Sequence, residues 1–504
     1  TRVLYARPPV VPVADVKAEI ARALAAPYGS APLAAKLRPG MKVLVALDDI
    51  SLPLPPMRAP DVRQQMLEVL LALFAEHGVD DIRIVVATGL HRRMTVREIR
   101  QMVGPRIFAA YAPERLYNHD AEKPGGMVLL GQTPEGHDVE LNRAVVETDL
   151  TVYLNISFVP MNGGHKSLGV GLAGYRTLRA HHNPRVMRAT ASYMDPERSV
   201  LHAHIDSIGR VVGEHVNVFH VECTLNNRMF PPALECLGRN EDDWSRMERL
   251  RVWGLRRTLD VLPARLRAAV FARVPAHYEV TGVFAGETVA THAHTLARML
   301  AQDAITVDEP CDILLYGIPY ISPYNVGAFL NPLLVQVLAQ GYLFNMHQGQ
   351  PLVKRQGTLI ITHPLSDRFD ERQHACYAEF FRRVLPKTRD AQVLFDQYEP
   401  EFAARRDYID AYRFGHAYHP VHPFYMWYWG EAARQHLGRV IVVGADNARA
   451  PETLGYESAE TVAEALAMAA ETAPAEPSIT MAHTPPLFLA QVGSRFIRDL
   501  RFTT

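Results

Sequence analysis

Carboxylate, imidazole, ammonium and glycine groups follow three apolar runs in the first half of the chain. The runs are 42–47, 82–87 and 149–156. The groups that follow them are Asp48 and Asp49, Thr88-Gly89-Leu90-His91, Gly163-Gly164-His165-Lys166 and, further on, His181-His182. Such side chains can transfer protons, bind a metal or attack as nucleophiles, so their convergence would make a catalytic cleft rather than a core.

Each of these groups also has a structural interpretation. Asp49 can cap the turn after its strand, because an aspartate accepts hydrogen bonds from nearby backbone N–H groups. His91 can be an ordinary loop histidine, and Gly163-Gly164 can simply permit positive φ in a tight turn. The same glycine pair would also let backbone N–H groups approach a phosphate. Residue types alone leave these interpretations open.

Apolar runs separated by helical patterns predict the elements that would position these groups. A second series of runs comprises 312–316, 357–362 and 439–443. Continuous apolar strands separated by helices indicate parallel sheets covered on both faces, and therefore an α/β fold. We expect two α/β domains with mostly parallel sheets, 1–280 and 281–504, with an Arg-rich helical insert near 242–276. Ligands bind beyond the carboxyl ends of such strands, where the chemical groups lie.

The composition is that of a globular enzyme. The 504 residues are 48% hydrophobic and 21% charged, which excludes a disordered chain or a coiled-coil rod. Lys and Arg number 53 against 54 Asp and Glu, a balance that argues against nucleic acid as a partner. No apolar run is long enough to span a membrane, and no secretory signal is evident. We expect a cytoplasmic enzyme whose four cysteines form neither a disulfide framework nor a zinc site.

Common cofactor and metal motifs are missing from the sequence. GGHK at 163–166 lacks the spacing of a P-loop, no GxGxxG follows a strand, and no HExxH occurs. His181 and His182 are adjacent, so at most one of them is expected to bind a given metal. The aromatic stretch 418–429 is expected to be a buried cluster, with a cleft wall against a planar ligand as the alternative. Ordinary NAD or ATP binding is not indicated.

Five short strings, in order, resemble the nickel-dependent lactate racemase family. They are ALDD at 46–49, ATGLHR at 87–92, NHD at 118–120, GGHKS at 163–167 and HHN at 181–183. The resemblance implies two α/β domains with the active site in the cleft between them. It also implies a nickel-pincer nucleotide, a pyridinium-3,5-bisthiocarboxylic acid mononucleotide that coordinates nickel through sulfur. The implied activity is that of an isomerase, a racemase or epimerase acting on hydroxy acids and their derivatives.

The resemblance also assigns roles to residues. Lys166 would tether the cofactor, His182 would complete the nickel coordination, and His91 would act as acid and base. The other positions assigned to cofactor binding are Asp48, Asp49, Thr88, Gly89, Gly163 and Gly164. A cationic, metal-tuned pyridinium is an electron sink, so hydrogen can leave carbon as hydride while imidazole takes the hydroxyl proton. Return of the hydride to the other face would invert the carbon.

Three departures from the family pattern fall on the substrate side. Residues 155–160 hold no histidine where a second acid–base histidine is usual, and Leu52 stands at the place of a substrate-binding arginine. The loop 317–325 shows neither the usual glutamine nor the usual lysine. We therefore expect the cofactor to be retained, and a larger hydroxy acid or a polyol or sugar-like compound to replace lactate. The second proton carrier is expected among His165, His119 and Asp49.

Two other functions remain open from the sequence. One is a non-catalytic homologue that binds the cofactor or nickel, which the missing arginine and histidine favour. The other is a metal-dependent hydrolase using His181 or His182 with Asp49. For the racemase, the expected partners are a small hydroxy acid or polyol and the enzymes that make the cofactor. No nucleic acid or membrane is expected to bind, and the chain could form a homo-oligomer.

Overall fold

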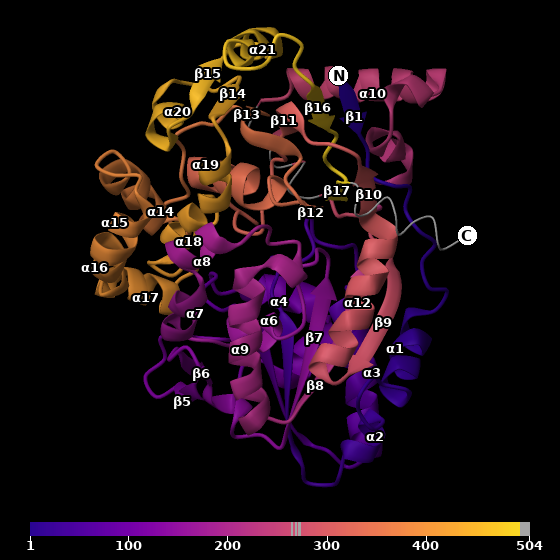
Figure 1. The fold of residues 1–504 in the computed structure, drawn as a ribbon. Helices are drawn as coiled ribbons and strands as arrows, with labels where there is room; N and C mark the ends of the chain where they lie inside the picture. Colours follow the sequence, from indigo (N-terminus) through magenta and orange to yellow (C-terminus); the bar gives the residue numbers. More distant parts are fainter. Residues whose placement is uncertain (264–265, 268–269, 271–273, 494–504) are drawn as a thin grey trace.

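Two six-stranded sheets, with helices packed on their faces, form the framework of the chain (Figure 1). The computed structural model describes residues 1–493 except 264–265, 268–269 and 271–273. Neighbouring strands of these two sheets run parallel, with one antiparallel pair. The predicted α/β class with mostly parallel sheets is confirmed.

The first sheet contains the three apolar runs of the first half. Its order is β4-β3-β2-β7-β8-β9, and β9 is antiparallel to β8. The strands are β2 (Lys42–Asp48), β3 (Asp81–Ala87), β4 (Leu116–Asn118), β7 (Leu150–Ser157), β8 (Val218–Leu225) and β9 (Val280–Gly286). Every residue of β7 is buried, as expected for a central strand covered on both faces.

The second sheet contains the three runs predicted in the second half. Its order is β1-β16-β11-β13-β14-β15, all parallel. The strands are β1 (Arg2–Leu4), β11 (Cys311–Gly317), β13 (Val353–Thr362), β14 (Arg439–Val443), β15 (Glu457–Ala459) and β16 (Ile479–Ala482). Two smaller sheets comprise β10 (Ala304–Val307), β17 (Leu489–Val492) and β12 (His347–Gly349), and the pair β5 (Met127–Gln132) and β6 (Asp138–Asn142).

Local signals set the helix ends in the first half. Asp61 accepts a hydrogen bond from the Arg63 backbone N–H at the start of α3, and Thr95 with Glu98 forms the predicted capping box of α4. The helices are α1 (Val16–Ala25), α2 (Leu33–Lys36), α3 (Val62–Glu76), α4 (Val96–Val103), α5 (Pro105–Tyr111), α6 (Lys166–Gly171), α7 (Tyr175–His181), α8 (Pro184–Ala189) and α9 (Val200–His215).

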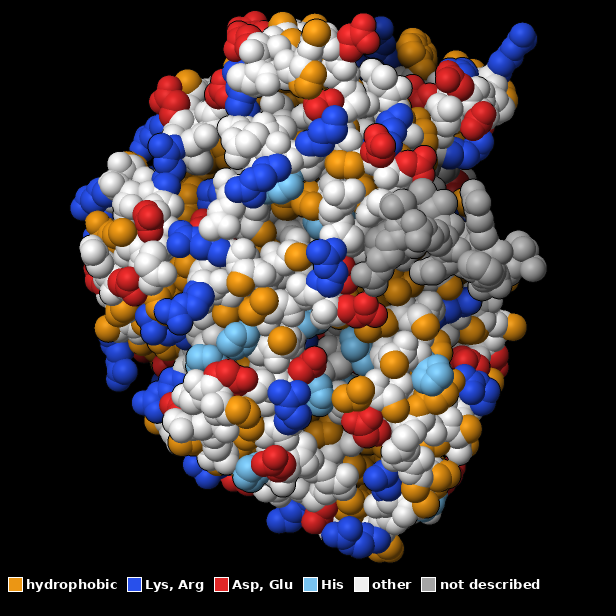
Figure 2. All heavy atoms as spheres, viewed as in Figure 1, with side chains coloured by type: hydrophobic (Ala, Val, Ile, Leu, Met, Phe, Trp, Pro, Cys, Tyr) orange, Lys and Arg blue, Asp and Glu red, His pale blue; other side chains and the backbone are white. Residues whose placement is uncertain are grey.

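Shorter helices surround the second sheet. They are α13 (Pro332–Gln336), α14 (Ala375–Glu379), α15 (Ala391–Val393), α16 (Glu399–Ala403), α17 (Arg406–Phe414), α18 (His422–Tyr428), α19 (Glu431–His436), α20 (Arg449–Leu454) and α21 (Val462–Ala470). None of the helices in the described part of the chain is long and apolar enough to cross a membrane. Charged side chains of both signs are interspersed over the face seen in Figure 2.

The chain passes between the two sheets twice. β1, at the N-terminus, pairs with β16 in the second sheet before the chain enters the first sheet at β2. Beyond residue 280, β9 pairs with β8, and α12 (Thr288–Asp303) packs on both strands. The first sheet therefore extends past the predicted boundary between 1–280 and 281–504.

The predicted helical insert near 242–276 contains α10 (Arg246–Val261). Ser245 and Glu248 form a capping box at its start. None of its residues is buried, and Trp253 is 58% exposed. Residues 264–265, 268–269 and 271–273 of the insert lie outside the described residues.

Candidate functional site

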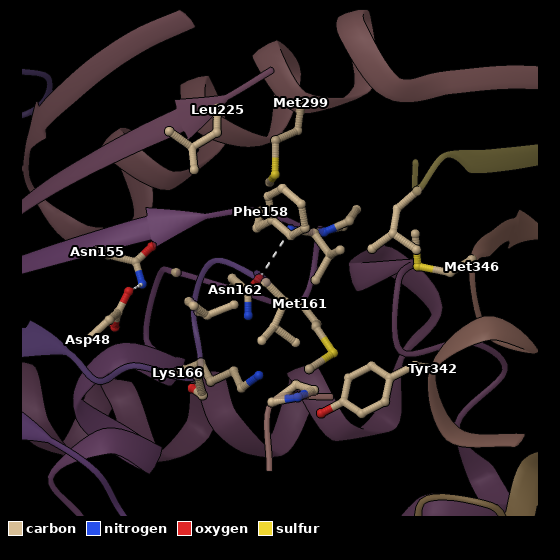
Figure 3. Close-up of a pocket in the computed structure, with 18 of the residues that line it drawn as sticks. Asp48, Asn155, Phe158, Met161, Asn162, Lys166, Leu225, Met299, Tyr342 and Met346 are labelled. Atoms are coloured by element: carbon tan, nitrogen blue, oxygen red, sulfur yellow. Dashed lines mark hydrogen bonds between the residues drawn. The ribbon is translucent and has the colours of Figure 1, made fainter. Parts of the chain in front are cut away.

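One cavity, of about 240 Å³, is lined by loops from both six-stranded sheets. From the first half come Asp48, Asp49, His91, Gly163, Lys166 and His182. From the second half come Tyr324, Tyr342, Trp429 and the segment Pro485–Leu489. Figure 3 shows Lys166, Asp48, Asn155 and Tyr342 around this space. The carboxyl ends of β2, β3 and β7 share one sheet edge, which explains why residues so distant in sequence meet here.

Asp48 joins β2 to β7 beneath the cavity. Its carboxylate accepts hydrogen bonds from Asn155 Nδ2 and the Ile156 backbone N–H, both at 2.8 Å, and from Tyr153 Oη at 3.1 Å. Burial raises the pKa of Asp48 to about 6, although these hydrogen bonds oppose the shift. Because its oxygens accept from three donors of β7, Asp48 fixes the carboxyl end of that strand beside β2.

Asp49 and His91 form a hydrogen-bonded pair at the cavity. His91 Nδ1 lies 2.9 Å from Asp49 Oδ2, and Ser51 donates its backbone N–H to Asp49 Oδ1 at 2.9 Å. Burial would raise the pKa of Asp49, but His91 and Ser51 outweigh it and lower that pKa. Asp49 therefore stays ionised and orients the imidazole, leaving the other ring nitrogen for proton transfer.

Lys166 is the first residue of α6 and points into the cavity (Figure 3). Its ammonium has no hydrogen-bond or ion-pair partner among the described residues. Burial lowers the pKa of Lys166 to about 8, and the charge of Asp48 opposes this shift. The neutral amine is the nucleophilic form, so its population near neutral pH is roughly 10²-fold that of an ordinary lysine.

The shifted lysine makes a testable prediction on the chain without cofactor. Reductive methylation, which needs the neutral amine, should modify Lys166 with a midpoint near pH 8, as its pKa of about 8 dictates. Exposed lysines such as Lys123, read from the same digest, give the reference profile of a solvent-exposed amine. Peptide mass spectrometry across a pH series measures both, and coincident profiles would refute the shift.

Two glycines form the turn that presents Lys166. Gly163 and Gly164 have φ of +89° and +58°. A Cβ on Gly163 would lie 2.7 Å from Glu222 Oε1, and one on Gly164 would lie 2.8 Å from the His292 ring. The Gly164 N–H donates to Glu222 Oε1 at 2.7 Å, so this N–H is held by a carboxylate of the chain itself.

Glu222 and His292 are site-supporting residues that the sequence analysis missed. Glu222 Oε2 lies 3.0 Å from His292 Nδ1 and 3.4 Å from Ser157 Oγ. Burial would raise the pKa of Glu222, but His292 and the Gly164 N–H outweigh it and lower that pKa to about 2. The available signal was a glutamate inside the apolar strand β8, where an unpaired charge is too costly to persist.

Substitution of Gly164 tests how tightly this turn is held. Gly164→Ala should lower the free energy of unfolding by about 2–4 kcal/mol, because left-handed φ and contact with His292 both penalise a methyl group. Gly136→Ala is the matched control: its φ is +81°, but a Cβ there meets nothing within 4 Å. It should lose only about 1–2 kcal/mol. Urea unfolding of both variants checks this, and equal losses would contradict close packing at Gly164.

His182 reaches the cavity through an aromatic cluster. Its ring stacks on Tyr425 at 5.1 Å and contacts Trp429 at 5.8 Å. Burial places the pKa of His182 well below its usual value, so the ring is neutral, and its Nδ1 has no hydrogen-bond partner. His181, next to it, is fully buried and does not line the cavity. A neutral imidazole with an unused nitrogen is a suitable metal ligand.

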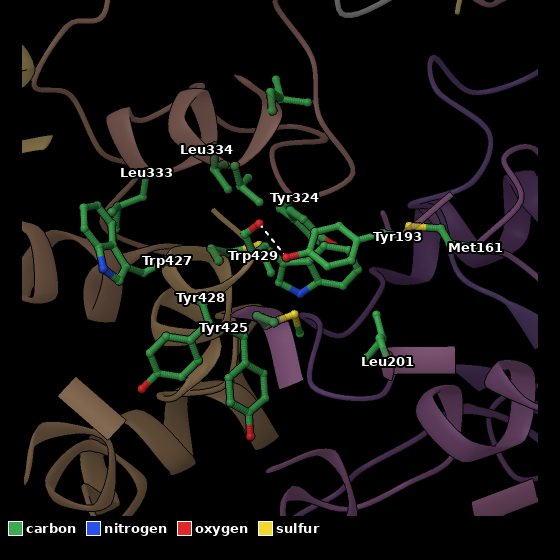
Figure 4. Packing of buried hydrophobic residues seen from close by; sticks show 14 of the residues in the cluster. Met161, Tyr193, Leu201, Tyr324, Leu333, Leu334, Tyr425, Trp427, Tyr428 and Trp429 are labelled. Atoms are coloured by element: carbon green, nitrogen blue, oxygen red, sulfur yellow. Dashed lines mark hydrogen bonds between the residues drawn. The ribbon is translucent and has the colours of Figure 1, made fainter. Parts of the chain in front are cut away.

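The aromatic stretch 418–429 is both a buried cluster and a wall of the cavity, the two alternatives considered from the sequence. All seven residues of α18 are buried, and Figure 4 shows Tyr425, Trp427 and Tyr428 within the packed cluster. Trp429 packs edge-on against Tyr193 at 4.5 Å and also lines the cavity. The cluster is therefore core on one side and cavity wall on the other.

Five of the predicted site residues do not line this cavity, and one of them is Gly164 of the turn described above. His119 is fully buried, with Nε2 donating to the Ala173 carbonyl and Nδ1 accepting from Asn142, and burial lowers its pKa to about 4. His165 lines a separate cavity beside Gly209 and His220. The others are Thr88, which donates to the His119 carbonyl, and Gly89, whose Cβ position abuts the Val170 carbonyl. Their placement is that of supporting residues.

Comparison with known proteins agrees with this geometry. Residues 2–194 match the lactate racemase N-terminal domain. The lactate racemases of Lactiplantibacillus plantarum and Thermoanaerobacterium thermosaccharolyticum are 35% and 31% identical over 106 residues, which is 20% of this chain and 24% of each relative. The N-terminal part of the chain, residues 2–194, is therefore similar to lactate racemases.

The likeness to this family extends through the fold. The lactate racemase apoprotein of Thermoanaerobacterium thermosaccharolyticum superposes with a TM-score of 0.62 over 95% of this chain and 93% of its own, at 16% identity. A Thermotoga maritima protein superposes with a TM-score of 0.54 over 95% and 97%, at 13% identity. The sequence matches span about a quarter of the curated relatives, so their activity is not transferred to this chain by similarity alone.

The three departures from the lactate racemase pattern are gathered at the cavity. Leu52 lines it, as do Phe158 and Val159 from the stretch without histidine. Pro319, Ile321 and Pro323, from the loop without glutamine and lysine, line it too. Apolar side chains thus line the cavity at all three places.

Proposed function

We propose that this chain is a racemase or epimerase that inverts a secondary-alcohol carbon with a nickel-pincer nucleotide. The observation that carries the proposal is the meeting of Lys166, His182 and the Asp49–His91 pair on one cavity. The match of residues 2–194 to the lactate racemase N-terminal domain supports the reaction class, and the resemblance of the short strings to that family supports the cofactor.

The residues at the cavity fit such a cofactor. Lys166 offers an unpaired amine with a lowered pKa, which suits covalent attachment. His182 offers a neutral imidazole with an unpartnered nitrogen. No group of three or more His, Cys, Asp or Glu in the described residues is arranged to hold a metal, so a hydrolytic metal centre built from protein ligands finds no support. A metal held mainly by a cofactor needs only one such ligand.

The chain's own residues divide the chemistry between them. When bound, the cofactor supplies an electron sink for the hydrogen on the alcohol carbon. His91 takes the hydroxyl proton and returns it, and Asp49 keeps the imidazole oriented for that transfer. Apolar walls, including Leu52 and Phe158, exclude water from the carbonyl formed in between.

Nickel and mass measurements test the proposal. Protein made together with the cofactor-synthesis enzymes should carry a nucleotide mass on the Lys166 peptide and close to one nickel per chain. His182→Ala should lose most of the nickel and keep the covalent mass, since only the coordination is removed. His181→Ala is the matched control, because the adjacent ring does not line the cavity.

Other outcomes of this experiment select other functions. An unmodified Lys166 would overturn the proposal. A loaded protein that converts no alcohol would be the non-catalytic homologue. A cytoplasmic location and a homo-oligomer remain predictions.

A further inference from the structure

The cavity continues from its polar end into an apolar chamber. Figure 3 shows Phe158, Met161, Leu225, Met299 and Met346 around the space that Lys166 enters. These side chains come from the loop after β7, the end of β8, α12 and the segment before β12. Methionine adapts its shape to what it contacts, so this wall suits a bulky apolar group of variable outline.

Charge in the cavity disfavours an anionic substrate. Among the described lining residues, Lys166 is the only lysine and no arginine occurs. In the proposed function that amine is already attached to the cofactor. The other lining carboxyls are those of Asp48, Asp49 and Asp303. The ionised carboxylate of Asp49, beside His91, repels a substrate carboxylate, whereas burial raises the pKa of Asp303 to about 7.

A polyol is disfavoured for a different reason. Each hydroxyl of a polyol buried against Leu225, Met299 or Phe488 would lose its water without gaining a hydrogen-bond partner. Polar partners gather at the other end, around Asp49, His91 and the Tyr324–Tyr342 hydroxyl pair, whose oxygens lie 2.5 Å apart. A substrate with one hydroxyl at the polar end and an apolar group in the chamber would match both parts of the cavity.

We propose that the substrate is an uncharged secondary alcohol with a large apolar substituent, its hydroxyl at the Asp49–His91 pair and its apolar body against Met161, Leu225 and Met299. This inference rests on the proposed function and specifies its substrate class. Inversion removes hydrogen and its electron pair from carbon and a proton from oxygen, then returns both. The two isomers have the same composition, so no external oxidant or reductant is needed.

A matched pair of probes tests the substrate class on the cofactor-loaded protein. The probes are 4-phenyl-2-butanol and 2-hydroxy-4-phenylbutanoate, which differ in a methyl group against a carboxylate. Calorimetry measures binding, and chiral chromatography measures conversion of one isomer into the other. The alcohol should bind roughly tenfold or more tightly than the acid, because the carboxylate of the acid finds no arginine partner. The kcat/KM for the alcohol should be higher by a similar factor. Leu52→Arg should reverse this preference, and Leu225→Asp should weaken binding of the alcohol.

The outcomes separate this inference from the function on which it rests. If the loaded protein prefers the acid, or does not bind the alcohol, the proposed substrate class is wrong. Interconversion of the isomers of the acid would then still support a racemase. Selective binding of the alcohol without interconversion of its isomers would sustain the substrate class and overturn the racemase. If Leu225→Asp keeps the Lys166 adduct but loses the preference for the alcohol over the acid, the apolar substituent of the alcohol binds in the chamber.

Discussion

Lys166→Ala should carry no covalent nucleotide and should lose at least about 10³-fold in isomerase activity, because the cofactor supplies the chemistry that side chains lack. The lysine begins α6 with its amine in the cavity, and no described residue takes its place. Intact mass and the mass of the peptide around residue 166 give the first readout, and chiral chromatography gives the second.

Two controls make this result specific. Lys166→Arg keeps the positive charge, but a guanidinium is too weak a nucleophile at neutral pH to form the adduct, so it should fail in the same way. Lys123→Ala, at an exposed position, should keep both the adduct and the activity. An adduct that persists in Lys166→Ala would refute the tether, and an active Lys166→Arg would show that charge rather than attachment matters.

His91→Ala should keep the covalent nucleotide and lower kcat by about 10²–10⁴-fold, the usual contribution of a positioned acid–base group. The imidazole lies on the cavity, 2.9 Å from Asp49, and is not required to hold the lysine turn. Intact mass must therefore stay at the wild-type value while steady-state kinetics change.

Asp49→Asn extends the test to the residue behind His91. An asparagine presents either an acceptor or a donor to Nδ1 and carries no charge, so it should orient the imidazole less well and cost less than His91→Ala. Because Asp49 acts through His91, the double variant should be no slower than His91→Ala alone. Additive losses would give Asp49 an independent role, and full activity of His91→Ala would remove the proposed base.

The strands were the most predictable part of the molecule. Runs such as 439–443 and 42–47 are apolar after their first residue, and the structure has strands there, β14 (Arg439–Val443) and β2 (Lys42–Asp48). A buried strand in a parallel sheet has no solvent face, so composition alone marks it. β8 was missed because His220 and Glu222 interrupt its apolar run.

The candidate site was predictable only where strand ends determine it. Asp49, His91 and Lys166 follow consecutive strands of one sheet edge, so topology alone brings them together. The partners from the second half, Tyr324 and Tyr342, depend on how two sheets pack, which no local pattern encodes. His119 and His165 carry the right chemistry but face away, because burial and side-chain direction are decided by tertiary packing.

The strand β1 has a mechanical consequence for access to the cavity. Because β1 is paired in the second sheet and β2 in the first, the two halves are joined by two covalent connections, 5–41 and the path through α12, instead of one. Two connections restrict the movement of one half against the other more than a single connection would. Cutting the chain at residue 280 would therefore leave each fragment without a strand of its own sheet.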